Sequence, residues 1–181
     1  MNPFKLIHTS IEGCYEIIPL RFEDSRGRFV KIFHSDLFEE YNLMTKYEEE
    51  YYAVSNKGVL RGLHFQEPPN EHVKLVTCLS GRILDVVVDL RKNSTTYSKW
   101  HSIELSGASD KLLYVPEGLA HGYYTMEDNT VFISLNSRKF SPESDSGILW
   151  NSIGFDWPDL SPILSEKDKK LASLEAYVSP F

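Results

Sequence analysis

Apolar and polar residues alternate along much of the chain with the two-residue period of β-strands. The clearest case is the segment 81–90, in which every second residue from 84 is apolar and Asp85 and Asp89 fall on the other face. Similar patterns, separated by turn residues, predict further strands at 14–19, 27–33, 49–55, 74–79, 100–105, 111–115, 121–126 and 130–135. Many short strands at this spacing predict an antiparallel sandwich or barrel.

Helical periodicity is scarce. One short helix is expected at 36–41. Beyond Pro162, Ser165 is followed three residues later by Asp168, the spacing of a capping box, which predicts a C-terminal helix after Ser165. No repeat, linker or low-complexity run divides the chain, so we expect one domain that spans residues 1–181.

Composition narrows the class of protein. The chain has 181 residues, 41% of them apolar, which is enough for one well-packed domain. Its net charge of −7 argues against binding to nucleic acid or to an anionic membrane, although a local basic cluster would still hold a small anion. We find neither a secretory signal nor a membrane span. Cys14 and Cys78 show no metal or redox spacing, so we expect reduced thiols and a cytoplasmic protein.

Three side chains would suit the removal of a proton from a carbon next to a ketone. His64 would be the base, because a neutral imidazole accepts protons near pH 7. Asp168 would orient its ring, and the Lys74 ammonium would stabilise the enolate oxygen. Each also has a structural explanation: a core or surface histidine, the acid of a capping box, and a solvated strand end.

A metal-binding barrel is an alternative. Pro116, Gly118 and His121 form a PxGxxH pattern that resembles the second half of the cupin signature. In the first half, however, Gln66 stands where a second histidine ligand is expected, and only His72 lies nearby as a substitute. We therefore expect no metal and no other cofactor.

Seven motifs extend in order from about Ile17 to about Leu174: RGLHFQ, KLV, DVVVDLR, VPEGLAHG, GILWN, FDWP and PILSEKD. Together they resemble the dTDP-4-dehydrorhamnose 3,5-epimerase family. The resemblance implies a mainly β, cupin-like antiparallel jelly-roll barrel with a few short helices. It also implies a homodimer in which an N-terminal segment reaches the partner's site.

The implied activity is metal-free epimerisation, at C3, C5 or both, of a nucleotide-diphosphate-linked 4-keto-6-deoxy sugar through an enolate. Such enzymes act in deoxysugar biosynthesis, for O-antigen or similar glycans. By motif, the resemblance makes His64 the base, Asp168 its partner and Lys74 the group at the keto oxygen. The other positions matched to substrate contacts are Arg26, Arg61, His121, Phe140 (on the nucleobase), Asp145 and Lys167.

The chain departs from this family at the position of the tyrosine proton donor. Ser134 stands where the family usually has the tyrosine that delivers a proton to the opposite face of the sugar. A serine hydroxyl is a far weaker acid than a phenol. Tyr51 and Tyr123 are the candidate replacement donors, and single-position epimerisation is an alternative outcome. Glu49 and Tyr51 also replace a glutamine and an asparagine of the family's pocket.

A further departure concerns the nucleotide. Lys31 aligns with a glutamate that lies near thymine in the family. A hydrogen-bond donor therefore stands where the family has an acceptor for the edge of the base. A CDP- or GDP-linked sugar is therefore an alternative to dTDP. A third class, a sugar-nucleotide binder without activity, is disfavoured because His64, Lys74 and Asp168 are all present.

Overall fold

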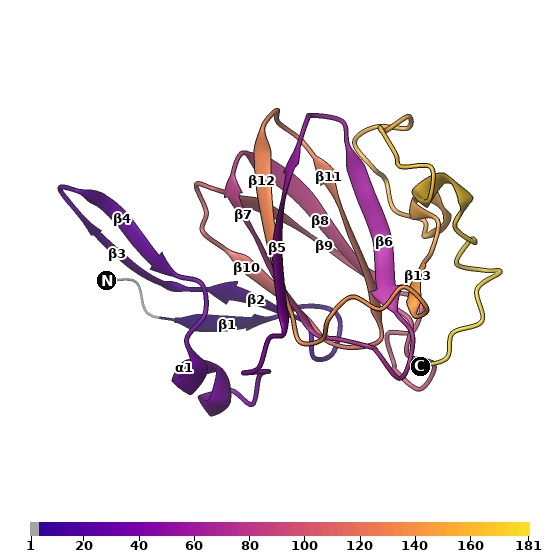
Figure 1. Ribbon diagram of the computed structural model, residues 1–181, viewed down its shortest axis with the longest axis horizontal. Helices are drawn as coiled ribbons and strands as arrows, with labels where there is room; N and C mark the ends of the chain where they lie inside the picture. Colours follow the sequence, from indigo (N-terminus) through magenta and orange to yellow (C-terminus); the bar gives the residue numbers. More distant parts are fainter. Residues whose placement is uncertain (1–3) are drawn as a thin grey trace.

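Two antiparallel β-sheets packed face to face form the body of the protein (Figure 1). The computed structural model describes residues 4–181. The six-stranded sheet has the order β1 (Lys5–His8), β2 (Tyr15–Ile18), β10 (Leu112–Val115), β7 (Lys74–Ser80), β12 (Thr130–Asn136) and β5 (Glu49–Ser55). The five-stranded sheet has the order β13 (Asp145–Gly147), β6 (Leu60–Gln66), β11 (Leu119–Thr125), β8 (Arg82–Asp89) and β9 (Trp100–Ser106). This architecture confirms the prediction of a mainly β, cupin-like antiparallel barrel.

The core of the described chain has three clusters, and β8 contributes to two of them. Between the sheets, Val87 of β8 packs with Val76 and Phe132. On the other face of β8, Val86 packs in a second cluster with Trp150, from the segment after β13. Because both faces of β8 are buried, its apolar residues run almost without interruption, and only paired polar side chains are tolerated among them.

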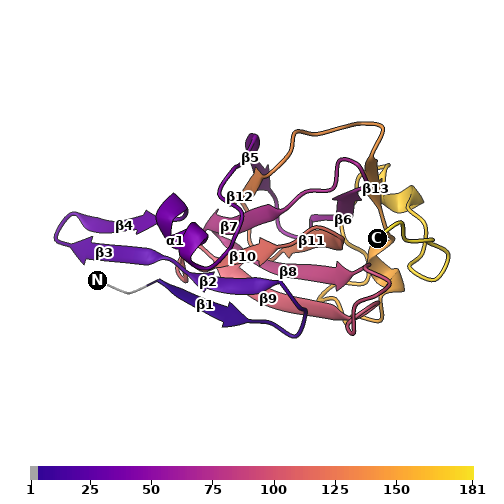
Figure 2. The same ribbon diagram turned by 90° about the horizontal axis from the view of Figure 1, so that it is seen from below.

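A two-stranded hairpin projects from this body (Figures 1 and 2). It consists of β3 (Leu20–Asp24) and β4 (Gly27–Lys31). In both views the hairpin lies at the end of the molecule opposite β6 and the C-terminal segment. Its aromatic side chains Phe22 and Phe29 are 38% and 60% exposed, so the hairpin presents apolar surface to its surroundings.

Helices are short, as expected. The helix α1 (Ser35–Glu40) confirms the prediction at 36–41, and its Phe38 is fully buried. Two 3₁₀ turns, Trp150–Ser152 and Asp168–Lys170, are the other helical elements of the described chain. No helix within residues 4–181 is both long and apolar enough to cross a membrane.

The predicted C-terminal helix after Ser165 is wrong in its extent. The Asp168 amide does donate to the Ser165 hydroxyl at 3.1 Å, as a capping box requires. The helix nevertheless ends after one 3₁₀ turn, because Ala172 forms a parallel β-bridge with Ile148 and its carbonyl accepts from the Leu149 amide at 2.8 Å. Tertiary pairing with the main sheet therefore overrides the local helical signal.

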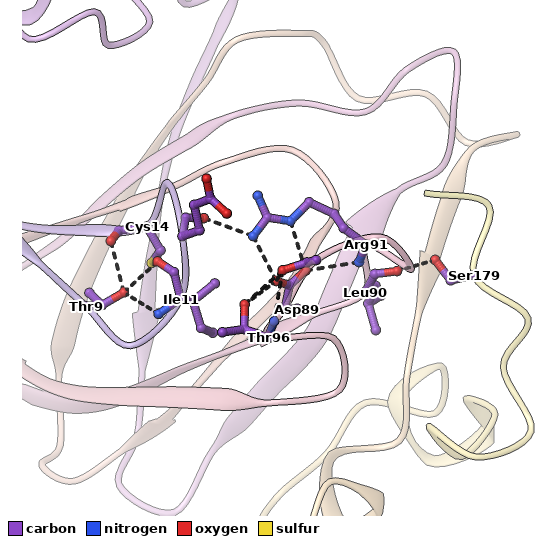
Figure 3. Close-up of polar contacts among 10 residues, drawn as sticks. Thr9, Ile11, Cys14, Asp89, Leu90, Arg91, Thr96 and Ser179 are labelled. Atoms are coloured by element: carbon purple, nitrogen blue, oxygen red, sulfur yellow. Dashed lines mark hydrogen bonds and ion pairs between the residues drawn. The ribbon is translucent and has the colours of Figure 1, made fainter.

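A buried acid ties the loop after β8 in place (Figure 3). Asp89 accepts from the Arg91 guanidinium at 2.8 and 2.9 Å and from the hydroxyls of Ser94 and Thr96 at 2.6 and 2.7 Å. Arg91 also donates to the carbonyl of Glu12, at 2.9 Å. The network fixes this loop and the turn after β1 to the end of β8.

Candidate active site

A β-bulge in β6 turns Arg61 and His64 to the same side of the sheet. His64 pairs with His121 of β11, but Arg61 pairs with Tyr123, so β6 has one residue more than β11 over this stretch. On a regular strand, residues three apart would face opposite sides. Gly62 permits the bulge: its φ is +136°, and a Cβ atom there would lie 2.6 Å from a backbone carbon of β11.

Arg61 and His64 line a hollow of about 590 Å³ between the two sheets. One wall comes from β5, β7 and β12, the other from β6 and β11, and the segment 163–168 closes one side. A second hollow of about 540 Å³ adjoins it, and four residues line both: Tyr51, His64, Lys74 and Lys167. Hollows of this size suit a small-molecule ligand.

His64 is held by Asp168, which lies 104 residues further along the chain. The Nε2 atom of His64 and the Oδ1 atom of Asp168 are 2.6 Å apart. Burial alone would raise the pKa of Asp168, but the hydrogen bond and charge of His64, aided by the Ser165 hydroxyl and the Gly62 amide, lower it below its ordinary value. An ionised carboxylate at Nε2 keeps that nitrogen protonated, which leaves Nδ1 as the basic nitrogen.

Lys74 is buried beside this pair rather than solvated at a strand end. Its side chain is largely enclosed, and Nζ donates to the His64 carbonyl at 3.2 Å. Burial lowers the pKa of Lys74 to about 8, against the opposing pull of Asp85 and Asp145. The ammonium is thus present at neutral pH, and Lys74 lines the same hollow as His64.

A second histidine–carboxylate pair, which the sequence analysis missed, lies on the neighbouring strands β11 and β8. His121 Nε2 is 3.0 and 2.9 Å from the two carboxylate oxygens of Asp85, and Asp85 is fully buried. The signal was an acid within the apolar strand β8, because a buried carboxylate is retained only when it is paired. His121 lines the first hollow, so Asp85 holds in place a side chain of its wall.

The second hollow gathers several of the predicted binding residues. Glu49 accepts from the Asn136 side chain at 3.2 Å, and Asn136 is a lining residue that sequence reasoning missed. Phe140 is 56% exposed at its edge, free to stack on a planar group. Asp145 and Lys167 form an ion pair on the same side.

The two candidate tyrosine donors lie in different surroundings. Tyr51 lines both hollows and is 45% exposed. Tyr123 is almost fully buried, stacks on Phe132 with ring centroids 4.3 Å apart, and has its pKa raised to about 12 by burial. Ser134 is fully buried, and its hydroxyl donates to the Asn136 side chain at 2.9 Å.

Arg26 and Lys31 are not brought to His64 within one chain. Both belong to the projecting hairpin, at the other end of the molecule from β6 (Figure 1). Arg26 is exposed and pairs with Asp24 at 2.6 Å. Any role for these two residues at the hollow would therefore require a second chain.

The side chains at and near the cupin-motif positions do not fit a metal site. Gln66 is committed to the fold: its amide donates to the Asn70 carbonyl at 2.8 Å, and its oxygen accepts from the Ser141 amide at 2.6 Å. Burial lowers the pKa of His72 to about 3, so it is neutral, but it does not join a donor cluster. Across residues 4–181, no three His, Cys, Asp or Glu side chains converge as metal ligands would.

The barrel and the titratable side chains between its sheets define a cupin-like enzyme. Residues 8–176 match the family model described as dTDP-4-dehydrorhamnose 3,5-epimerase. The chain is 40% identical to the enzyme of that name from Methanothermobacter thermautotrophicus over 93% of this chain and 94% of the relative.

Two solved structures agree. The Bacillus anthracis dTDP-4-dehydrorhamnose 3,5-epimerase, solved with TDP and PPi bound, superposes with a TM-score of 0.92 and 35% identity over 95% of this chain and 100% of that one. A dTDP-6-deoxy-D-glucose-3,5-epimerase from Legionella pneumophila, in complex with dTDP-4-keto-L-rhamnose, gives a TM-score of 0.91 and 32% identity, over 96% and 94% of the two chains. The chain belongs to the dTDP-4-dehydrorhamnose 3,5-epimerase family. It is a carbohydrate epimerase, an isomerase that acts on a sugar nucleotide in deoxysugar biosynthesis.

Proposed function

We propose that this protein epimerises a nucleotide-diphosphate-linked 4-keto-6-deoxy sugar at C3, C5 or both, through an enolate and without a metal. The observation that carries the proposal is the 2.6 Å contact between His64 and Asp168 in the hollow that also receives the buried ammonium of Lys74. A base, a group that orients it and a cation for the enolate oxygen are what proton abstraction next to a ketone requires.

In the first step, Nδ1 of His64 takes the proton from the carbon next to the keto group. The electron pair of the broken C–H bond forms the enolate, and its negative charge on oxygen is stabilised by Lys74. Asp168 stabilises the imidazolium, which then loses its proton to solvent. Return of a proton to the opposite face of the carbon restores the ketone and inverts the centre.

The two hollows divide the substrate between them. Arg61 and His121 serve the sugar and the adjoining phosphate in the first hollow, because both line it. Phe140 stacks on the nucleobase in the second hollow, where Glu49, Asp145 and Lys167 supply polar contacts. Relatives solved with TDP or a dTDP-sugar support a nucleotide sugar as the substrate.

We further propose that residues 1–181 form one domain that works as a homodimer. The hairpin β3–β4 would be exchanged, so that Arg26 and Lys31 reach the partner's hollow. Its projection from the body and its exposed Phe22 and Phe29 support this arrangement.

A second candidate is epimerisation at one carbon of a CDP- or GDP-linked sugar. The observation in its favour is Ser134, which is fully buried and donates its proton to Asn136. Lys31 adds a donor near the expected base position. Calorimetric titration with dTDP, CDP and GDP would separate the nucleotides, and a clear preference for dTDP would remove this candidate's nucleotide assignment.

The proposed function is tested by incubating the protein with dTDP-, CDP- and GDP-linked 4-keto-6-deoxyglucose in D₂O. NMR reports which carbon takes up deuterium and whether it inverts. We expect exchange and inversion with at least one substrate, and loss of both in His64→Asn. The matched control, His101→Asn, changes a histidine of β9 outside the hollow and should behave as the wild type. No exchange at either carbon with any substrate would contradict the proposal.

A further inference from the structure

Tyr51 and Ser134 lie directly opposite each other in the antiparallel pairing of β5 with β12. Opposite residues of such a pair point to the same face of the sheet, with Cβ atoms about 5 Å apart. That face is the interior one, because Ala53 and Phe132, each two residues away along its strand, line the first hollow. A phenol at position 51 therefore enters the space that a long side chain at position 134 would fill.

Ser134 cannot itself serve as the acid. It is fully buried and lines neither hollow, so its hydroxyl is not presented to either of them. The residue opposite Tyr51 is thus a small one, which leaves room for the larger tyrosine side chain.

The walls of the hollow decide between the two tyrosines. Inversion requires a proton to leave one face of the carbon and another to arrive on the opposite face. His64 stands on β6 in the five-stranded sheet, and Tyr51 stands on β5 in the six-stranded sheet that faces it. Tyr123 is on β11, the neighbour of β6, and therefore belongs to the same wall as the base.

On this geometry we propose that Tyr51 is the catalytic acid that protonates the substrate carbon on the face opposite His64. The inference rests on the proposed epimerase function. The phenol gives its proton to the enolate carbon, whose electron pair forms the new C–H bond. The phenolate then takes a proton from solvent, which reaches it because the side chain is 45% exposed.

The state of the phenol agrees with this role. Burial raises the pKa of Tyr51 above its ordinary value, while a hydrogen bond with Ser134 and the charge of Arg61 work in the opposite direction. The hydroxyl therefore carries its proton at neutral pH, as an acid must before it acts.

The decisive variant is Tyr51→Phe, assayed in D₂O with the substrate that the wild type inverts. His64 remains, so the carbon should still take up deuterium, but with retention of configuration. Inversion should fall by about 100-fold or more. The control is Tyr52→Phe, the next residue of β5, which is 70% exposed and lines neither hollow. It should invert at the wild-type rate, and thermal melting would verify that both variants fold.

A second variant moves the phenol across the strand pair. Tyr51→Asn combined with Ser134→Tyr should regain inversion to within about 10-fold of the wild type, because the two positions share one face. Inversion by Tyr51→Phe at the wild-type rate would overturn the proposal, as would loss of both exchange and inversion, or loss of inversion in Tyr123→Phe alone. A wild type that shows no exchange would instead defeat the epimerase function itself.

Discussion

The Nε2 atom of His64 lies 2.6 Å from the Oδ1 atom of Asp168, although the two residues come from a central strand and from the C-terminal segment. The single 3₁₀ turn after Ser165 is what presents the carboxylate to the ring. The same turn thus caps the Asp168 amide and places the Asp168 carboxylate against the ring of His64.

This pair predicts a difference between two variants. Asp168→Asn should lower kcat by roughly 10²–10⁴-fold, because an amide stabilises the imidazolium poorly and no longer fixes the tautomer. Ser165→Ala removes only the hydroxyl that accepts the Asp168 amide, and should cost about 1 kcal/mol of stability while retaining most of the rate. Steady-state kinetics and thermal melting measure both. Equal rate losses would show that the carboxylate has no special role.

Lys74 predicts a limit to activity at high pH. Since burial lowers its pKa to about 8, the ammonium that we propose to stabilise the enolate should be lost as pH rises through that value. The rate on the alkaline side should fall accordingly in a profile of kcat against pH. A rate that stays level to pH 10 would contradict a role for the charged form.

The same burial predicts that Lys74 weakens the fold. Its folded pKa of about 8 lies below the unfolded value of 10.5, so the charged form is disfavoured in the folded state. The penalty, about 3 kcal/mol, is present below pH 8 and fades as pH rises towards the unfolded value. Lys74→Met should therefore be inactive yet more stable by about 1–3 kcal/mol at pH 7 in denaturant titrations. Lys57→Met, an exposed control, should change neither property.

The network around Asp89 predicts acid sensitivity. Burial would raise the pKa of Asp89, but its hydrogen bonds to Arg91, Ser94 and Thr96 lower it from 3.8 to about 2. This stabilisation, about 2 kcal/mol, is complete above the unfolded pKa and is lost as pH falls through the folded one. Asp89→Asn should lower the free energy of unfolding by a similar amount at pH 7. The stability of this variant should also fall less steeply as the pH is lowered. The control Asp156→Asn, which changes an exposed acid, should leave the stability unchanged. A matching loss in this control would contradict the stabilising role of Asp89.

Exchange of the hairpin predicts complementation between two inactive chains. Arg26→Ala and His64→Asn should each abolish or strongly reduce activity. Co-expressed, they should recover about a quarter of the wild-type rate, because half of the dimers are mixed and each mixed dimer has one intact site. Light scattering would establish the dimer. No recovery in a proven mixed dimer would place Arg26 outside the partner's site.

The sequence alone determined the class of fold. Period-two alternation and turn residues placed the strands at 81–90, 74–79 and 130–135 close to β8, β7 and β12, because those patterns reflect which faces are buried. It did not resolve β6, where the bulge at Gly62 interrupts the alternation. The helix after Ser165 failed because a local capping signal says nothing of the bridge from Ala172 to the main sheet.

The motifs of the sequence also indicated His64, Lys74 and Asp168 as candidates for the chemistry. Only the tertiary structure decided the partners: Asp168 meets His64, and the unexpected Asp85 meets His121. The tertiary structure alone also set Tyr51 on the wall opposite His64 and left the hairpin outside the hollow. Such pairings depend on strand register and on how distant segments pack, and neither can be deduced from spacing along the chain.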